Sequence, residues 1–252
     1  MIYWIWLNNL PGIGPHTQRL LLEQFNTPEN IYSASQSELE NCGLSKNRIN
    51  TILENKNLSS ADNILFDCKR KGISVMNVSQ ETFPDRLRLN DDMPVLIYYK
   101  GKMFNPEKTA GIVGPRKCTQ ETKEKVIAIT KRCVLSGETI VSGMAIGVDG
   151  YAHTAAIKNL GRTIAVVANG LDICFPKAHD TLFEEIQQAG FVMSEYPPGT
   201  PALAYHFPRR NSIIAAMSDS LYVINPGRNS GSLITAQFAE KYSKPVKMID
   251  VY

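Results

Sequence analysis

The sequence lacks the motifs that mark several common classes of enzyme and binding protein. It contains no CxxC pair, and its five cysteines are an odd number, which argues against a complete disulfide framework and favours a reducing cytoplasm. Neither the GxGxxG dinucleotide fingerprint nor the GxxxxGK phosphate loop occurs. These absences weigh against hydride transfer and against ATP hydrolysis by a phosphate-loop enzyme.

Long hydrophobic runs and an excess of one charge are also missing. The apolar start at 1–7 is far shorter than the ~20 residues of a membrane-spanning helix, and it has no charged signal-peptide region. The formal net charge is only +3, from 27 Lys and Arg against 24 Asp and Glu. We therefore expect no membrane partner, and we expect any phosphate binding to depend on local clusters of positive charge.

Hydrophobic periodicity divides the chain into two regions. Residues 1 to about 56 predict a small all-helical domain, with helices near 17–25, 31–39 and 46–53, and the polar stretch 55–60 is the predicted linker. From residue 61 onward, strands alternate with helices. This alternation predicts right-handed βαβ crossovers and a doubly wound α/β domain over 61–252 with a buried, mainly parallel sheet.

The expected α/β elements run as follows: helix 61–71, strands 73–78 and 94–100, then strand 109–113, helix 119–136, strand 138–142, helix 149–160, strand 162–168, helix 179–189, strand 191–194, helix 211–218, strand 220–224, helix 232–242 and strand 245–250.

Between Gly114 and Ser232, five short apolar runs end in glycine, serine, asparagine or a basic residue. Because the carboxyl ends of parallel strands lie along one edge of a sheet, where helix N-termini also point, these endings predict a phosphate-binding surface without a metal site. The runs and their continuations are 112–116, 140–143, 166–170 with Lys177 beyond, 192–194 continuing to 207–211, and 223–225 continuing to 230–232.

Each of these features also has a purely structural interpretation. Arg116 can be a surface charge after a turn, Lys177 can be a solvated loop lysine, and Ser230 can simply cap a helix. The glycine turn at 11–14 fits a helix-hairpin-helix that contacts a DNA phosphate, but such turns also serve only for packing. The coincidence of five strand ends favours phosphate binding.

Asp149 and His153 lie four residues apart on a predicted helix and could form an acid/base pair. The sequence shows no nucleophile and no third partner for such a pair. A helix-capping aspartate and a core histidine are therefore the favoured interpretation.

Several motifs, in this order, resemble those of the DNA-processing protein A family, also called DprA or Smf. The resemblance extends over nearly the whole chain. The motifs are LPGIG over 10–14, IVGPR over 112–116, SGMAIGVDGYAH over 142–153, TIAV over 163–166, SEYPPG over 194–199, FPRRN over 207–211 and SGSLITA over 230–236.

The resemblance implies an extended Rossmann-like domain behind a sterile-alpha-motif-like or helix-hairpin-helix domain at 1–56. It also implies a non-catalytic, cytoplasmic homodimer without a cofactor, which binds single-stranded DNA and loads the RecA recombinase during natural transformation. The residues that it implies for DNA binding are Arg116, Lys177, Arg209, Arg210 and Asn211 for phosphate, Gly114, Ser142, Gly143, Ser230, Gly231 and Ser232 for the pocket, and Phe175 for base stacking.

Three positions depart from the family pattern. Pro115 replaces the usual serine, Ile146 a usual basic residue and Ser212 a usual arginine. Two positive charges are thus expected to be missing from the groove. Each lost phosphate contact is expected to lower the salt slope of DNA binding by about 1.

Two other functions are compatible with parts of the sequence. Pro226-Gly227 followed by Ser230-Gly231 is similar to the loop of the cytokinin-activating phosphoribohydrolases, but Ala236-Gln237 stands where those enzymes place a glutamate. A diverged protein-binding regulator that has lost DNA affinity is the second alternative.

Overall fold

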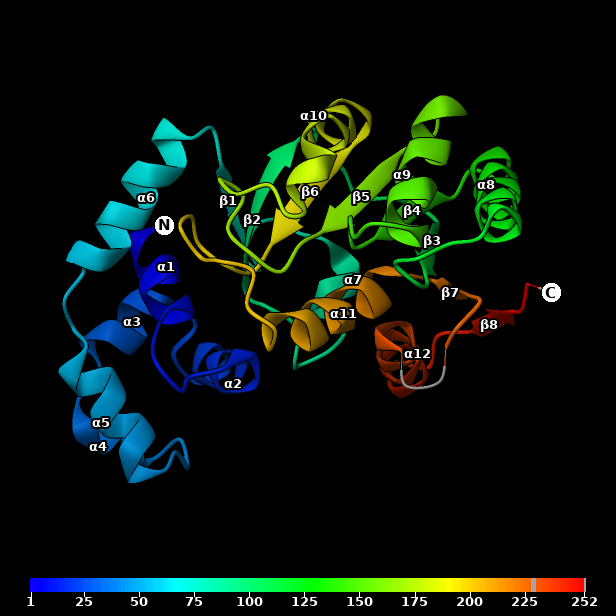
Figure 1. The fold of residues 1–252 in the computed structure, drawn as a ribbon. Helices are drawn as coiled ribbons and strands as arrows, with labels where there is room; N and C mark the ends of the chain where they lie inside the picture. The colour runs from blue at the N-terminus through cyan, green and yellow to red at the C-terminus, as the bar shows by residue number, and fades with distance from the viewer. Residues whose placement is uncertain (228–229, 252) are drawn as a thin grey trace.

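A computed structural model describes residues 1–227 and 230–251 and shows one mixed sheet with helices on both faces (Figure 1). Over these residues the sheet has eight strands in the order β1-β2-β6-β5-β4-β3-β7-β8. All neighbouring pairs are parallel except β1-β2 and β2-β6. The strands are β1 (Ser74–Asn77), β2 (Leu96–Gly101), β3 (Thr109–Val113), β4 (Thr139–Ser142), β5 (Thr163–Val166), β6 (Phe191–Ser194), β7 (Ser220–Ile224) and β8 (Val246–Ile249).

The central strands are buried because helices cover them on both sides. Every residue of β3 is buried, as expected for a parallel strand between two helical layers. In Figure 1, α8 (Gln120–Leu135), α9 (Val148–Lys158) and α10 (Asp180–Ala189) lie on one face, and α11 (His206–Met217) and α12 (Gly231–Lys241) lie on the other. The predicted doubly wound, mainly parallel α/β fold is confirmed.

The N-terminal region is helical, as predicted. It contains α1 (Ile2–Asn8), α2 (Pro15–Phe25), α3 (Pro28–Ser33), α4 (Gln36–Glu40) and α5 (Lys46–Glu54), followed by α6 (Ser59–Arg70). The single helix predicted at 31–39 is wrong, because Ser35 starts a new helix. Its side chain accepts a hydrogen bond from the Glu38 amide, while the Glu38 carboxylate accepts from the Ser35 amide.

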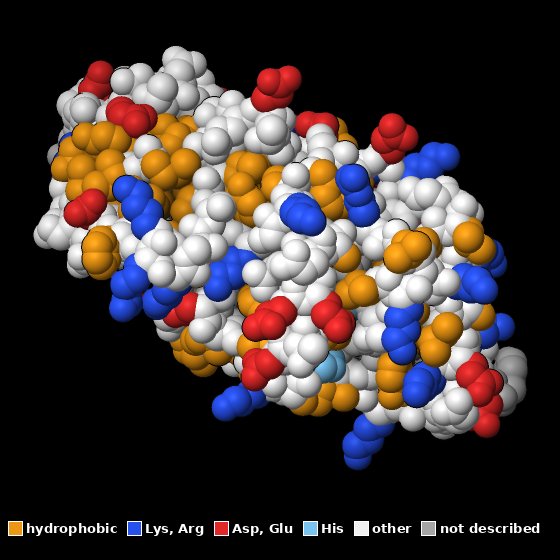
Figure 2. All heavy atoms as spheres, turned by 90° about the horizontal axis from the view of Figure 1, so that it is seen from above, with side chains coloured by type: hydrophobic (Ala, Val, Ile, Leu, Met, Phe, Trp, Pro, Cys, Tyr) orange, Lys and Arg blue, Asp and Glu red, His pale blue; other side chains and the backbone are white. Residues whose placement is uncertain are grey.

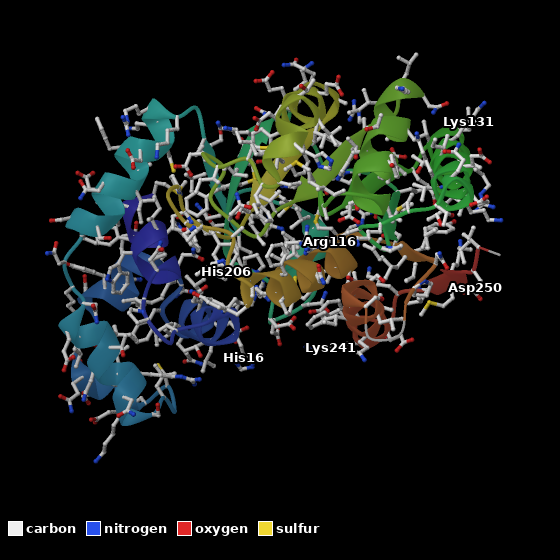
Figure 3. All side chains as sticks on the ribbon, viewed as in Figure 1. His16, Arg116, Lys131, His206, Lys241 and Asp250 are labelled. Atoms are coloured by element: carbon white, nitrogen blue, oxygen red, sulfur yellow. The ribbon has the colours of Figure 1, made fainter. Side chains whose placement is uncertain are left out.

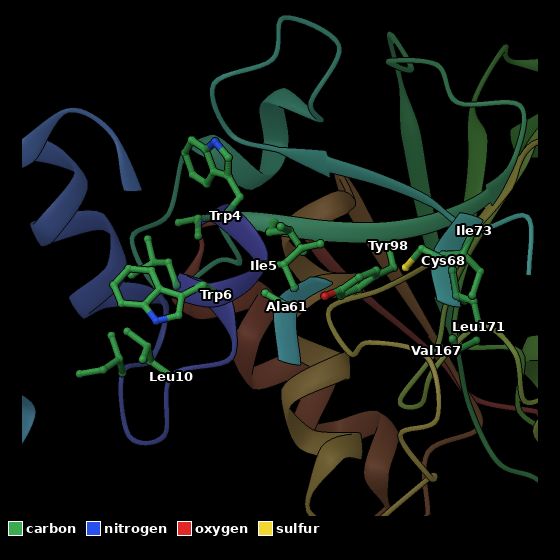
Figure 4. Packing of buried hydrophobic residues seen from close by; sticks show 14 of the residues in the cluster. Trp4, Ile5, Trp6, Leu10, Ala61, Cys68, Ile73, Tyr98, Val167 and Leu171 are labelled. Carbon is green, nitrogen blue, oxygen red and sulfur yellow. The ribbon is translucent and has the colours of Figure 1, made fainter. Parts of the chain in front are cut away.

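The N-terminal helices pack directly on the sheet region. One hydrophobic cluster runs from Trp6 and Ile5 of α1, past Ala61 of α6, to Tyr98 of β2 (Figure 4). In addition, Arg19 of α2 donates hydrogen bonds to the carbonyl oxygens of Met93 and Leu87, at 3.2 and 2.7 Å. The cluster and the arginine together fix the position of these helices relative to the sheet.

Two helices on the functional side begin earlier than predicted. Helix α11 starts at His206, not at 211, because Pro208 falls in its first turn, where a missing N–H costs nothing. Helix α9 starts at Val148, and its N-cap is Gly147 at φ +89°, a conformation that favours glycine. Arg209 and Arg210 therefore lie on a helix rather than in a loop. None of the helices described has the length and hydrophobicity needed to span a bilayer.

Candidate nucleic-acid interface

A groove lies at the carboxyl edge of the sheet, at the point where the chain order reverses between β3 and β7. In doubly wound folds this point is the usual ligand-binding crevice. The groove consists of two adjoining cavities, of about 390 and 110 Å³, which share Arg116, Ala145, Phe207 and Arg210. The structure brings these expected site residues into its lining: Gly114, Arg116, Gly143, Phe175, Arg210, Asn211, Ser230, Gly231 and Ser232.

Phe207 forms the centre of this groove. The guanidinium groups of Arg116 and Arg210 lie 5.8 and 5.7 Å from the centre of its ring, within the range of a cation–π interaction. The ring of Phe175 lies 6.1 Å from it. Phe207 was not among the predicted site residues, although its spacing of three and four residues from Arg210 and Asn211 places all three on one face of a helix.

Arg210 is a buried cation in the floor of the groove. Only 6% of it is exposed, and Nη1 donates to the carbonyl oxygens of Gly143 and Val166. Burial lowers the pKa of Arg210, and the nearby Asp149 charge opposes this effect. Burial likewise raises the pKa of the Asp149 carboxyl, against the Arg210 charge and the Ala145 amide. Asp149 thus partly neutralises the charge that Arg210 brings to the groove.

The strand ends of the groove have little space for side chains. A Cβ atom on Gly143 would lie 1.8 Å from Nη1 of Arg210, so only glycine leaves room for this guanidinium. Ser142, which was expected to line the pocket, is fully buried and donates to the carbonyl oxygen of Ile112 at 2.6 Å. This hydrogen bond ties β4 to β3 beneath the groove.

The loop after β5 carries the exposed members of the site. Phe175 is 45% exposed, and Lys177 is exposed in the short 3-10 helix Lys177–His179. Asp172 anchors this loop, because its carboxylate accepts hydrogen bonds from Nζ of Lys71 at 2.7 Å and from the Gly199 amide at 2.8 Å. Lys177 lies outside the lining of the two cavities but on the loop that borders them.

Arg209 has a different environment from its neighbour. Nε donates to both carboxylate oxygens of Glu195, and Nη1 donates to the Asp92 carbonyl oxygen. Arg209 lines a separate cavity of about 310 Å³, together with Tyr196 and the predicted hairpin turn at Gly14. The structure therefore does not bring Arg209 into the groove.

The start of α12 forms the opposite wall. Its N-cap residue, Ser230, makes no side-chain capping hydrogen bond in the described part of the chain, and its Oγ lies 2.8 Å from Oγ of Ser232. Asn211 donates to the carbonyl oxygen of Gly231 at 3.2 Å and so fixes the start of α12 to α11. The hydrogen bonds of the described residues therefore do not support helix capping as the role of Ser230 and Ser232.

The three departures from the family pattern have different positions. Ile146 is 50% exposed and lines the smaller cavity, and Pro115 lines the larger one. Ser212 is only 2% exposed, lies outside both cavities and donates to the carbonyl oxygen of Arg209 at 2.6 Å. The expectation that two cations are missing from the groove is therefore corrected to one, at Ile146.

Asp149 and His153 do not form a pair. His153 is fully buried and shares a 2.7 Å hydrogen bond with Oγ1 of Thr163, whereas Asp149 accepts from the Ala145 amide. The core histidine is confirmed, but the predicted cap is wrong, because the helix begins one residue earlier, after Gly147. Among residues 1–227 and 230–251, no three His, Cys, Asp or Glu side chains are arranged to hold a metal ion.

The charges on one face of the molecule are mixed. Figure 2, seen from above relative to Figure 1, shows Lys and Arg side chains interspersed with Asp and Glu. This distribution agrees with the small net charge of +3. With so small a net charge, electrostatic attraction of an anionic polymer depends on local clusters of cations.

Comparison with known proteins identifies relatives in both sequence and structure. Residues 74–251 match the family model of the DNA recombination-mediator protein A. The chain is 33% identical over 250 residues to protein Smf of Synechocystis, covering 97% of this chain and 63% of the relative. It is 35% identical over 196 residues to DNA processing protein DprA of Bacillus subtilis, covering 75% of this chain and 66% of the relative. The chain thus spans slightly less than two thirds of the length of these curated relatives.

Solved structures of DNA processing protein A are also similar to this chain. DNA processing protein A of Streptococcus pneumoniae superimposes with a TM-score of 0.81 and 28% identity, over 98% of this chain and 84% of that chain. DNA processing protein A of Helicobacter pylori, whose structure concerns its binding of single-stranded DNA, superimposes with a TM-score of 0.64 and 29% identity, over 70% and 80% of the two chains.

Proposed function

The chain belongs to the DNA recombination-mediator protein A family, and on this premise we propose that it is a non-catalytic protein that binds single-stranded DNA without sequence preference. The groove at the carboxyl edge of the sheet is the proposed binding site. Family membership, the solved relative that binds single-stranded DNA and the chemistry of the groove support this proposal.

One observation carries the proposal: two arginines lie within 6 Å of a single aromatic ring inside the groove. Proteins that bind single strands combine cations, which attract the phosphate backbone, with aromatic rings, on which bases stack irrespective of sequence. Phe207 and Phe175 supply the rings, and Arg116 and Lys177 supply exposed charge. The bases of a duplex are already stacked and paired, so they cannot reach these rings.

The proposal assigns roles to the expected residues. Arg116, Lys177 and Asn211 contact phosphate, and Arg210 attracts it from the floor of the groove. Gly114, Gly143 and the segment 230–232 let the strand approach closely, because glycine and serine are small and their amides can donate to phosphate. Phe175 stacks on a base. Ser142 positions the groove from below.

The proposal extends to the role of the protein in the cell. We place it in the cytoplasm as a homodimer that delivers incoming single strands to the RecA recombinase in natural transformation. Membership of a recombination-mediator family supports this part. It is tested by measuring RecA assembly on a long single strand, which should be faster with the wild-type protein than with an Arg116→Glu variant. Equal rates with both proteins would refute delivery through this groove.

A titration of oligo-dT and of a duplex of equal length, repeated across salt concentrations, tests DNA binding itself. The account predicts tighter binding of the single strand, with an affinity that falls linearly with salt on logarithmic axes. Equal affinity for the two DNAs, or no binding to either, would overturn the proposal.

A further inference from the structure

Tyr205 is an exposed aromatic side chain at the start of α11 that the proposed site does not include. It is the N-cap residue of α11, immediately before His206, and 71% of it is exposed. Leu203, two residues earlier, is 37% exposed. Nothing in the groove described above explains why the start of α11 presents apolar surface to solvent.

Among the described residues, the Tyr205 ring contacts one other aromatic ring, that of His206. It meets the His206 ring edge to face, with 4.5 Å between the centroids. His206 is buried, stacks on Tyr196 with 3.9 Å between the centroids, and shares a 3.0 Å hydrogen bond with the Ala168 carbonyl oxygen. The contact with the buried His206 ring restricts Tyr205 on one side, which reduces the conformational entropy that Tyr205 loses when a base stacks on its free side.

Tyr205 and the groove lie on opposite sides of the start of α11. Phe207, Arg210 and Ile214 line the groove at helical spacing. Tyr205 precedes Arg209 by four residues and therefore lies on the same side of the helix as Arg209, which lines the cavity with Tyr196 and Gly14. Figure 3 shows His206 nearer than Arg116 to the N-terminal helices that carry His16.

We propose that the bound single strand leaves the groove across the N-terminus of α11 and stacks a base on Tyr205. This inference depends on the proposed function and adds a direction to it: the strand exits toward the N-terminal helices. Crossing the helix start is favourable for a phosphate, because the helix dipole and the first-turn amides attract negative charge there. The exposed ring beyond it then receives the next base.

The test compares Tyr205→Ala and Tyr205→Phe on two probes, oligo-dT and an abasic strand of the same length. We expect Tyr205→Ala to bind oligo-dT about 5- to 150-fold more weakly, the range that one stacked base contributes. Binding of the abasic strand should not change, and Tyr205→Phe should retain the wild-type affinity for both. Phe66→Ala, which removes a 65% exposed ring from α6, is the matched control and should bind as the wild type does.

Equal affinity of Tyr205→Ala and the wild type for oligo-dT would overturn the inference, as would an equal loss on both probes, which indicates a structural defect. A length series adds a second measurement: the wild type should gain more affinity than Tyr205→Ala when the strand is long enough to leave the groove. If the wild type binds neither probe, the proposed function fails and the inference fails with it. If the wild type binds oligo-dT and Tyr205→Ala matches it, only the inference fails.

Discussion

Nε of Arg209 donates to both carboxylate oxygens of Glu195, at 2.9 and 2.8 Å, while the next residue, Arg210, is buried in the floor of the groove. Adjacent residues on a helix point about 100° apart, so these two arginines serve different surfaces. Arg210 places positive charge beneath the proposed DNA strand. Arg209 connects α11 to the segment after β6 and to the loop at Asp92.

This arrangement predicts that Arg209 contributes to stability rather than to DNA affinity. Arg209→Met should lower the free energy of unfolding by about 1–3 kcal/mol, because the Glu195 side chain, only 12% exposed, loses its charged partner. Urea unfolding measures this loss. Affinity for oligo-dT should stay at the wild-type value. A weakened affinity at unchanged stability would show instead that Arg209 contacts phosphate.

Replacing Ile146 with arginine is expected to strengthen DNA binding. It is half exposed in the smaller cavity beside Arg116 and Phe207, at a position where a guanidinium could reach a bound phosphate. Ile146→Arg should tighten the binding of oligo-dT and steepen its salt slope by about 1. The matched control is Leu160→Arg, which adds the same charge at a 97% exposed position in the turn before β5. Equal salt slopes for Ile146→Arg and Leu160→Arg would show that Ile146 does not lie beside the bound DNA.

Removing the aromatic ring of Phe207 is expected to weaken DNA binding without changing the charge of the groove. Phe207→Leu keeps an apolar side chain but removes the ring next to Arg116 and Arg210. Binding of oligo-dT should weaken by about 1–3 kcal/mol if a base stacks there. Binding of an abasic strand should change less. An equal effect on both strands would mean that Phe207 only positions the arginines.

The buried, neutral His153 is expected to make the protein less stable at acidic pH. Burial, and then the charges of His179 and Arg210, lower its pKa to about 3. The unfolded chain takes up this proton near pH 6.5, whereas the native state does not, so stability falls as the pH drops below 6.5. Between pH 6.5 and pH 5 the free energy of unfolding should decrease by about 1.6 kcal/mol, because the unfolded histidine is already half protonated at pH 6.5.

His153→Gln isolates this effect, because glutamine can keep a hydrogen bond to Thr163 but does not titrate. The variant should lack this decrease between pH 6.5 and 5 in urea unfolding. The comparison with the wild type is needed because the raised pKa of Asp149 acts in the opposite direction. Identical pH profiles of the two proteins would contradict a buried, neutral His153.

The sequence predicted most of the fold because each element carries its own local pattern. The apolar run 109–113 predicts β3 with correct bounds, and the alternation of strands and helices predicts the sheet edge on which the groove lies. The break between α3 and α4 was missed, although Ser35 and Glu38 carry the spacing of a capping box. The start of α11 was missed because the prediction treated 207–211 as the continuation of the strand end at 192–194.

The site was less predictable, because its residues are defined by tertiary contacts. The family resemblance implies the same phosphate-binding role for Arg209 and Arg210, and only the packing of α11 on the strand ends buries Arg210 and pairs Arg209 with Glu195. From sequence alone, Phe207 resembles a core residue. Its place in the groove is seen only in the structure, where two guanidinium groups lie beside its ring. Ser212 was expected to face the groove because sequence alone does not give the rotation of a helix.

The most direct test of the account is the affinity of Arg116→Glu for oligo-dT, compared with that of Lys131→Glu. Both substitutions reverse one exposed positive charge, but Arg116 lies in the groove and Lys131 lies on α8, away from it (Figure 3). The account predicts that Arg116→Glu abolishes binding, as should Lys177→Glu, while Lys131→Glu binds as the wild type does. Retained binding by both Arg116→Glu and Lys177→Glu would contradict the groove as the site of single-stranded DNA.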